Sequence, residues 1–319
     1  MKASFKLCCL ALIILVSGST ALFGSPEVTS TDKNSLIKRT ILWQGIERNY
    51  LIHLPPVDYM LASMPVIVNL HGGGGTAKGT SRLNKWRFNE LADQDGFIVV
   101  YPNAIDKSWN DGRSQILKPQ NKDVDDVGFI AAIIQELKAI YDVDLTKIYA
   151  TGMSNGGFMT TRLLCDRADL FRGGAVVTAS ISKEYFPQCA PTQKVGVLVI
   201  NGTADPLVPY NGGQIKVFRK TRGEILSTDD YINFWIANND CNSDPSRTDL
   251  PDSKPYDGTT VTVSQYDCDT GNPVVLYRVN GGGHTWPGGK QYLGKRLIGV
   301  TSREFNACEV IWDFFKTLE

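Results

Sequence analysis

The sequence predicts an α/β domain in which a mostly parallel central sheet is flanked by helices. Short apolar runs of the kind found in buried parallel strands alternate along the chain with longer stretches of helical periodicity. The chain has 319 residues, of which 42% are hydrophobic and 21% charged, enough for one domain with a substantial core. We find no internal repeat, low-complexity tract or linker, so a single domain is expected.

The predicted elements follow this alternation along the chain. Apolar and polar residues alternate on both sides of Gly45, which indicates an opening antiparallel hairpin over residues 40–55. Asp125 and Asp126 are suited to the N-cap and first turn of a helix. β-Branched and aromatic runs predict strands at 66–70, 97–101, 147–151, 175–178, 195–201, 260–266 and 274–279. Helical patterns predict helices at 85–94, 127–141, 158–165, 228–238 and 303–318.

A candidate nucleophile lies between the predicted strand 147–151 and the helix that follows it. Residues 152–156 read Gly-Met-Ser-Asn-Gly, and a strand, a sharp turn and a helix are the context in which a G-x-S-x-G serine acts. The two glycines leave out side chains where strand and helix crowd together. We therefore expect Ser154 to be the nucleophile and the amide of Asn155, at the helix start, to be an oxyanion donor.

Only three histidines are available as a general base. His284 lies in a glycine-rich segment just after the predicted strand 274–279, where the backbone can present an imidazole to a cleft. We expect His284 to be the base. His53 lies among apolar residues in the opening hairpin, and a structural role is expected for it.

The acid is expected after the strand between those of the serine and the histidine, because the hydrolase order is Ser, then Asp or Glu, then His. Asp205 follows the apolar run 195–201 and fulfils this order. As the acid, it would accept the Nδ1 proton of His284 and leave Nε2 free to take the Ser154 proton. An Asp-Pro turn without a catalytic role is the alternative interpretation.

An oxyanion loop is predicted after strand 66–70. His71 and the four glycines behind it resemble the HGGG-type loop that supplies a second backbone donor. The amide of Gly73 or Gly74 would join that of Asn155. His71 is expected to order this loop. A phosphate-binding interpretation fails, because no lysine follows Gly79 as a P-loop requires.

Together these motifs resemble the secreted esterases related to polyhydroxybutyrate depolymerases and feruloyl or acetylxylan esterases, within the α/β-hydrolase fold. The resemblance implies that Ser154, Asp205 and His284 form a triad that hydrolyses carboxylic esters through an acyl-enzyme, without a cofactor. Asn201 departs from the pattern, because relatives often carry a histidine there. The motifs that carry the resemblance are HGGGG at 71–75, DDVGF at 125–129, YATGMSNGG at 149–157, GTADPLVPY at 202–210 and GHTWPG at 283–288.

The substrate is left open between a hydroxyalkanoate polyester or oligomer and a feruloyl or acetyl ester of a plant polysaccharide. The loops at 103–122 and 206–223 are expected to shape the substrate site. His71, Trp109 and Trp286 are candidate substrate contacts. A lipase-type or peptidase-type reaction would use the same triad, and a non-catalytic polymer- or carbohydrate-binding protein could use the same scaffold.

An export signal is predicted at residues 1–21. Lys2 and Lys6 precede the apolar run 7–16, and small residues at 19–21 suit a cleavage site. A secreted or periplasmic esterase domain of residues 22–319 is therefore expected, without stable membrane association, although an uncleaved anchor is the alternative. With 33 basic and 33 acidic residues the formal charge is zero, which gives no electrostatic basis for nucleic-acid binding.

Five cysteines lie beyond the predicted signal, and disulfides are their expected use in an oxidising compartment. Cys241 and Cys268 bracket a polar excursion and the strand after it, so a bridge there would hold the loop down. Cys165 and Cys189 bracket the segment after the nucleophile helix, and the resembled family pairs cysteines at equivalent places. Cys308 is expected to be a buried thiol, and no metal site is expected.

Overall fold

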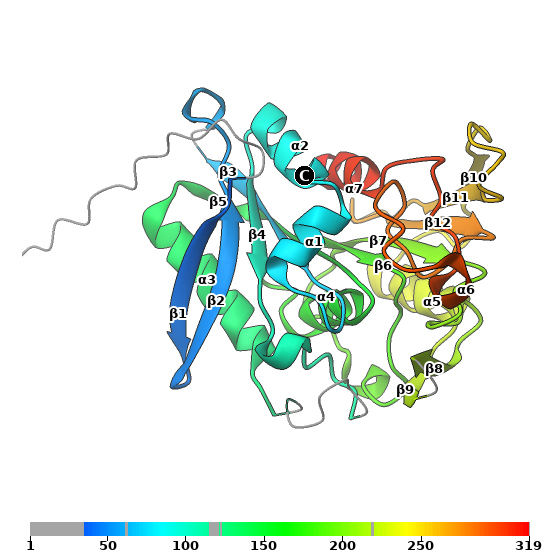
Figure 1. The fold of residues 1–319 in the computed structure, drawn as a ribbon, viewed down its shortest axis with the longest axis horizontal. Helices are drawn as coiled ribbons and strands as arrows, with labels where there is room; N and C mark the ends of the chain where they lie inside the picture. The colour runs from blue at the N-terminus through cyan, green and yellow to red at the C-terminus, as the bar shows by residue number, and fades with distance from the viewer. Residues whose placement is uncertain (1–34, 61–62, 115–120, 122, 218–219, 319) are drawn as a thin grey trace, which may run out of the picture.

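A ten-stranded sheet with helices on both faces dominates the structure, a computed structural model that describes residues 35–60, 63–114, 121, 123–217 and 220–318 (Figure 1). The predicted export signal lies outside these described residues. The strands are β1 (Ile37–Trp43), β2 (Ile46–His53), β3 (Met64–Leu70), β4 (Ile98–Pro102), β5 (Val143–Met153), β6 (Gly173–Val177), β7 (Gly196–Gly202), β8 (Gly213–Val217), β9 (Lys220–Ile225), β10 (Ser246–Asp249), β11 (Thr260–Tyr266) and β12 (Val274–Asn280). The α-helices are α1 (Ala77–Leu83), α2 (Arg87–Asp95), α3 (Asp126–Ile140), α4 (Asn155–Asp166), α5 (Thr228–Asn239), α6 (Lys295–Ile298) and α7 (Ala307–Lys316).

The sheet has the strand order β1-β2-β4-β3-β5-β6-β7-β12-β11-β10. The six strands from β4 to β12 in this order are parallel to one another. β2 and β1 extend the sheet beyond β4 by antiparallel pairing, and β11 and β10 extend it beyond β12 in the same way. β8 and β9 form a separate antiparallel hairpin. Because the parallel strands share one direction, the loops after β3, β5, β7 and β12 emerge at the same edge of the sheet.

Alternate residues of the central strands face two hydrophobic cores. On β3, Val66 and Val68 belong to one core and Ile67 to the other. Residues of α3, α4 and α5 complete the first core, and residues of α2 and α7 complete the second (Figure 1). Burial on both faces explains why these strands read as continuous apolar runs in the sequence.

The mostly parallel sheet flanked by helices is confirmed, and the strands and helices predicted from the sequence are present, with ends that differ by a few residues. The sequence does not predict α1, α6, β10 or the β8–β9 hairpin. This hairpin lies in segment 206–223, where the apolar pattern is weak, since on β8 only Ile215 is fully buried. None of the helices in the described part of the chain has the length and apolar character needed to cross a membrane.

A buried ion pair joins the start of α3 to β2. Asp126 Oδ1 accepts a 2.6 Å bond from Arg48 Nη2, and both side chains are almost completely buried. Asp126 Oδ2 accepts a 2.7 Å bond from the amide of Asn110, so the pair also anchors the loop after β4. The preceding residue, Asp125, caps α3 through the amide of Gly128 at 2.7 Å, as the sequence predicts.

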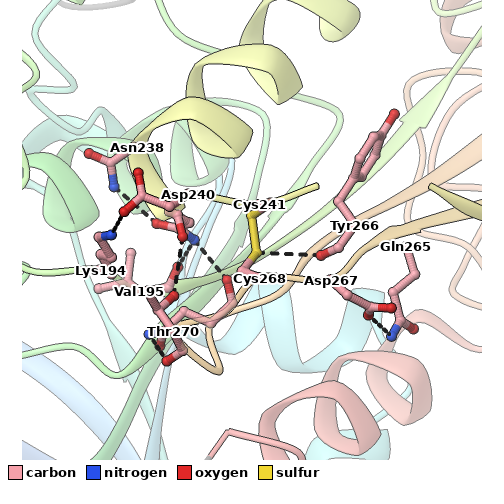
Figure 2. Close-up of a disulfide and its surroundings, with 12 residues drawn as sticks. Lys194, Val195, Asn238, Asp240, Cys241, Gln265, Tyr266, Asp267, Cys268 and Thr270 are labelled. Atoms are coloured by element: carbon pink, nitrogen blue, oxygen red, sulfur yellow. Dashed lines mark hydrogen bonds and ion pairs between the residues drawn. A yellow bond between two sulfur atoms is a disulfide. The ribbon is translucent and has the colours of Figure 1, made fainter. Parts of the chain in front are cut away.

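Both predicted disulfides are formed. The bridge between Cys241 and Cys268 ties the end of α5 to the turn between β11 and β12 (Figure 2). The bridge between Cys165 and Cys189 ties the last turn of α4 to the segment before β7. Cys308 is buried in α7 as a free thiol, and burial raises its pKa well above the usual range, so it stays protonated.

The ion pair gives a first prediction. Asp126→Ala leaves the Arg48 guanidinium buried without its counter-charge, and we expect the free energy of unfolding to fall by about 3–5 kcal/mol. Urea denaturation followed by circular dichroism measures this change. Asp169→Ala, which removes an exposed ion pair with Arg167, is the matched control and should cost less than about 1 kcal/mol. Equal effects of the two substitutions would contradict the importance of the buried pair.

Candidate active site

Ser154 occupies a sharp turn between β5 and α4. Its backbone has φ 58° and ψ −123°, a conformation that residues with side chains rarely adopt, and its amide donates to the carbonyl of Val177 at 2.9 Å. A Cβ atom on Gly152 would lie 2.5 Å from the carbonyl oxygen of Gly156. A Cβ atom on Gly156 would lie 2.3 Å from the carbonyl oxygen of Leu70. Glycine is therefore required at both positions for the turn to close.

The predicted acid and base are in direct contact. Asp205 Oδ2 lies 2.8 Å from His284 Nδ1, and both side chains are almost completely buried. The other carboxylate oxygen of Asp205 accepts the amides of Leu207 and Val208 at 2.8 and 2.9 Å. These two bonds fix the carboxylate and leave one oxygen for the imidazole, which favours the tautomer with a proton on Nδ1.

The loop that carries His284 is held by its neighbours on both sides. The His284 amide donates to the carbonyl of Ile298 at 2.6 Å, and its carbonyl accepts the hydroxyl of Tyr292 at 3.0 Å. A Cβ atom on Gly283 would lie 2.2 Å from the Ile298 carbonyl oxygen, so the loop needs this glycine to reach α6. The sequence did not single out Tyr292. Burial and, to a smaller degree, the negative charge of Asp205 raise its pKa, so its hydroxyl remains a donor.

A cavity of about 450 Å³ opens in front of these residues. Ser154 and His284 both line it, together with the glycine loop after β3. Arg113 and Arg222 add polar groups to a surface that is otherwise mainly apolar. The apolar lining residues are Leu83, Met153, Phe158, Leu207, Val208, Ile215, Val217, Leu293 and Ile298.

The predicted oxyanion loop requires a correction. The amide of Gly74 donates to the carbonyl of Lys107 at 2.8 Å and is not available to a substrate. The amide of Gly75 turns back to the carbonyl of Gly72 at 2.9 Å. Gly73 lies exposed between them at the cavity wall, and within the described residues its amide has no backbone acceptor. Sequence reasoning could not separate Gly73 from Gly74, because the Lys107 carbonyl reaches the loop only in the folded chain.

The side chain of Asn155 clamps the turn to the loop after β4. Its Oδ1 accepts the amide of Trp109 at 2.8 Å, and its Nδ2 donates to Asp111 Oδ2 at 2.7 Å. Asp111 also forms a buried ion pair with Arg113, whose guanidinium lies over the ring of Phe158 at 4.2 Å. The sequence indicated this network only as part of the loop 103–122, which was expected to shape the substrate site. The clamp leaves the Asn155 amide, at the start of α4, facing the cavity side of the turn.

The three candidate substrate contacts do not line the cavity. Trp109 is completely buried, and its Nε1 donates to the carbonyl of His71 at 2.8 Å. Trp286 is also buried and packs edge-on against Phe88 in the core that α2 and α7 share. His71 is buried behind the glycine loop. The expectation that these three residues contact substrate is therefore corrected, because each of their rings is buried and none of them lines the cavity.

His71 orders the glycine loop as the sequence predicts. Its Nε2 accepts the amide of Ala104 at 3.1 Å, so Nδ1 carries the proton and donates to the carbonyl of Gly72 at 2.8 Å. Burial lowers the pKa of His71 to about 4, and the charge of Lys107 acts in the same direction. The imidazole is therefore neutral near pH 7.

Two other expectations concern residues near the site. His53 bonds to Asp93 at 2.7 Å and to the carbonyl of Ser35 at 3.0 Å, which fits its structural role.

Asn201, at the end of β7, bonds to both backbone groups of Ala179 and to the hydroxyl of Thr228, so it ties β7 to the neighbouring loop and to α5. Among the described residues, no group of three or more His, Cys, Asp or Glu side chains could hold a metal ion.

Known proteins with similar sequences include esterases. A protein named "Putative esterase NocK" from Nocardia uniformis subsp. tsuyamanensis is 28% identical over 283 residues, which are 86% of this chain and 81% of the relative. Feruloyl esterase B from Piromyces equi is 28% identical over 236 residues, which are 71% of this chain but only 40% of that enzyme. Residues 82–187, which include Ser154 but neither Asp205 nor His284, match the prolyl oligopeptidase family.

A solved structure with the same architecture is that of an acetyl xylan esterase from Aspergillus awamori. It is 15% identical, with a TM-score of 0.55, and the match covers 78% of this chain and 94% of that one. This likeness shows that the chain has the α/β-hydrolase fold.

The buried imidazole of His71 gives a second prediction, on pH. The unfolded chain binds a proton at this histidine below about pH 6.5, whereas the folded chain does so only near pH 4. Stability should therefore fall as the pH falls through this window, by roughly 3 kcal/mol from this group. In His71→Gln, which can still accept the Ala104 amide, the loss between pH 7 and pH 4 should be smaller by that amount. Urea unfolding at several pH values measures it, and identical curves for both proteins would refute it.

Proposed function

We propose that Ser154, His284 and Asp205 are nucleophile, base and acid of a serine esterase, because the chain has the α/β-hydrolase fold and resembles esterases over most of its length. The observation that carries this proposal is the buried 2.8 Å contact between Asp205 and His284, beside a cavity that Ser154 enters from a strained turn. A carboxylate, an imidazole and a half-buried hydroxyl at a cavity wall are the groups that acyl transfer requires.

In the proposed reaction, Ser154 Oγ attacks the ester carbonyl carbon while His284 Nε2 takes the hydroxyl proton. The negative charge that develops on the carbonyl oxygen is stabilised by the amides of Gly73 and Asn155. His284 then gives the proton to the leaving alkoxide, and the alcohol departs from an acyl-enzyme. Water attacks this ester, His284 takes a proton from the water and returns it to Ser154, and the carboxylic acid leaves.

The substrate that we propose is an ester of a plant cell-wall polysaccharide with an aromatic acyl group of the feruloyl type. Feruloyl esterase B is among the relatives, and the cavity is mainly apolar and far larger than an acetyl group requires. The ring of Phe158 lies in its wall. An acetyl ester is the second candidate, suggested by the name of the acetyl xylan esterase neighbour.

The place of action that we propose is outside the cytoplasm. Two disulfides in one domain are typical of proteins from oxidising compartments. The signal-like residues 1–21 support secretion or export to a periplasm.

Triad variants give a third prediction, for turnover of p-nitrophenyl butyrate. Ser154→Ala should lower kcat on the order of 10⁶-fold, because the nucleophile is absent. Asp205→Asn should lower kcat by roughly 10⁴-fold, since an amide NH₂ facing Nδ1 favours the wrong tautomer of His284. Circular dichroism spectra should match that of the wild type. Activity that survives in Ser154→Ala would rule out the proposed nucleophile, and binding of polymer without any turnover in the wild type would favour a non-catalytic protein.

Acyl specificity gives a fourth prediction. We expect kcat/KM for methyl ferulate to exceed that for a soluble 3-hydroxybutyrate oligomer at least tenfold, because an apolar cavity gains more from burying an aromatic ring than from burying the smaller apolar area of a hydroxybutyryl group. Peptide p-nitroanilides test the peptidase reaction suggested by the match over residues 82–187, and no turnover is expected. A preference for the hydroxybutyrate oligomer would overturn the aromatic assignment while leaving the triad intact.

A further inference from the structure

A second cavity, of about 600 Å³, lies outside the proposed catalytic residues, where α5 packs beside β10, β11 and β12. We call it the α5 groove. Unlike the catalytic cavity, it is lined mainly by polar side chains. Those that define it are Tyr210, Asp229, Asn233, Arg247, Tyr266 and Arg278. The proposed reaction uses none of these residues.

The α5 groove holds more positive than negative charge. Arg247 extends from β10 and Arg278 from β12, and within the described part of the chain neither forms a salt bridge. Asp229, the one carboxylate among the described residues that line the groove, accepts a 3.2 Å bond from the hydroxyl of Tyr210. The Arg278 guanidinium lies 5.4 Å from the centre of the Tyr210 ring. Two cations with a single anion favour a ligand that brings a carboxylate.

The remaining lining groups fit a polyhydroxylated ligand. On β11, Ser264 pairs with Arg247 and Thr262 pairs with Arg278 in the strand register. Ser264 offers a hydroxyl group, and the Thr262 hydroxyl, which donates to Asp249 Oδ1 at 2.7 Å, can still accept a hydrogen bond. Asn233 and Asn280 offer amides that both donate and accept. Ile232 and Leu276 complete the lining with apolar surface, and the tyrosine rings provide faces for C–H groups. Sugar rings present hydroxyls at their rims and C–H groups on their faces, so they match this mixture.

The α5 groove and the catalytic cavity are neighbours along the loop that carries the proposed acid. Leu207 and Val208 line the catalytic cavity, and Tyr210, two residues further, lines the α5 groove. The carbonyl of Tyr210 accepts the amide of Thr228 at 2.8 Å, which holds this loop against the start of α5. Residues 207–210 of one short segment therefore contribute to both cavities.

We propose that the α5 groove binds an acidic oligosaccharide segment of the ester-bearing polysaccharide, with a uronate carboxylate recognised by Arg247 and Arg278. The inference rests on the proposed function for the statement that the bound saccharide belongs to the substrate. The groove then supplies binding energy from a part of the substrate remote from the reacting ester, which raises kcat/KM for polymer but not for small esters.

Isothermal titration tests the site without turnover, on the Ser154→Ala protein with a glucuronate-substituted xylotetraose and with unsubstituted xylotetraose. The acidic ligand should bind at least about tenfold more tightly, and raising the salt concentration should weaken it. Arg278→Gln and Arg247→Gln should each reduce its affinity about tenfold. Lys38→Gln, which removes one positive charge on β1 at the opposite edge of the sheet, should leave it unchanged.

Three results would overturn the proposal: no binding of either oligosaccharide, equal affinity for both, or binding that the two arginine substitutions do not weaken. The titration contains no ester bond, so its failure is separate from a failure of the esterase reaction. That reaction is measured with p-nitrophenyl butyrate on the same protein with Ser154 restored.

Discussion

The geometry of the site depends on the close approach of three backbone segments at the carboxyl end of β5. The turn at Ser154, the end of β3 and the first turn of α4 come so near one another that no Cβ atom fits at Gly152 or Gly156. This contact holds Ser154 at a positive φ that an unsupported serine would not keep. It also brings the start of α4 beside the glycine loop, so the amides of Asn155 and Gly73 reach one cavity. The proposed nucleophile and the proposed oxyanion donors are thus positioned by the same packing.

Buried polar groups continue this constraint into the loop after β4. Arg48 and Asp126 anchor the amide of Asn110, and the next residue, Asp111, holds the side chain of Asn155. In a low-dielectric interior such bonds are strong when every member has a partner, and the loss of one member leaves another unpaired. An ion pair on β2, the second strand of the sheet, is therefore linked to the first residue of α4.

The segment after β7 contributes residues to two cavities of different chemistry. Leu207 and Val208 line the mainly apolar cavity that contains Ser154, and Tyr210 lines the polar α5 groove with its two arginines. An ester of a polysaccharide has the same division, with an apolar acyl group on one side of the reacting bond and a hydroxylated chain on the other. Substrate specificity would then come from loops that the sheet positions but does not define, as is usual for this kind of scaffold.

The sequence by itself determined the alternation of strands and helices and the order of serine, aspartate and histidine motifs, because these depend on local periodicity, glycine content and spacing along the chain. The two cysteine pairings were expected from the segments that they bracket and, for Cys165 and Cys189, from the family resemblance. From the sequence, Trp109 and Trp286 were candidate substrate contacts, and Gly73 and Gly74 were equivalent candidates for the second oxyanion donor. Only the tertiary structure decided that both tryptophans point into the interior, that the Lys107 carbonyl occupies the Gly74 amide, and that Asp111 clamps Asn155. These outcomes depend on contacts between loops far apart in the sequence, which no local pattern records.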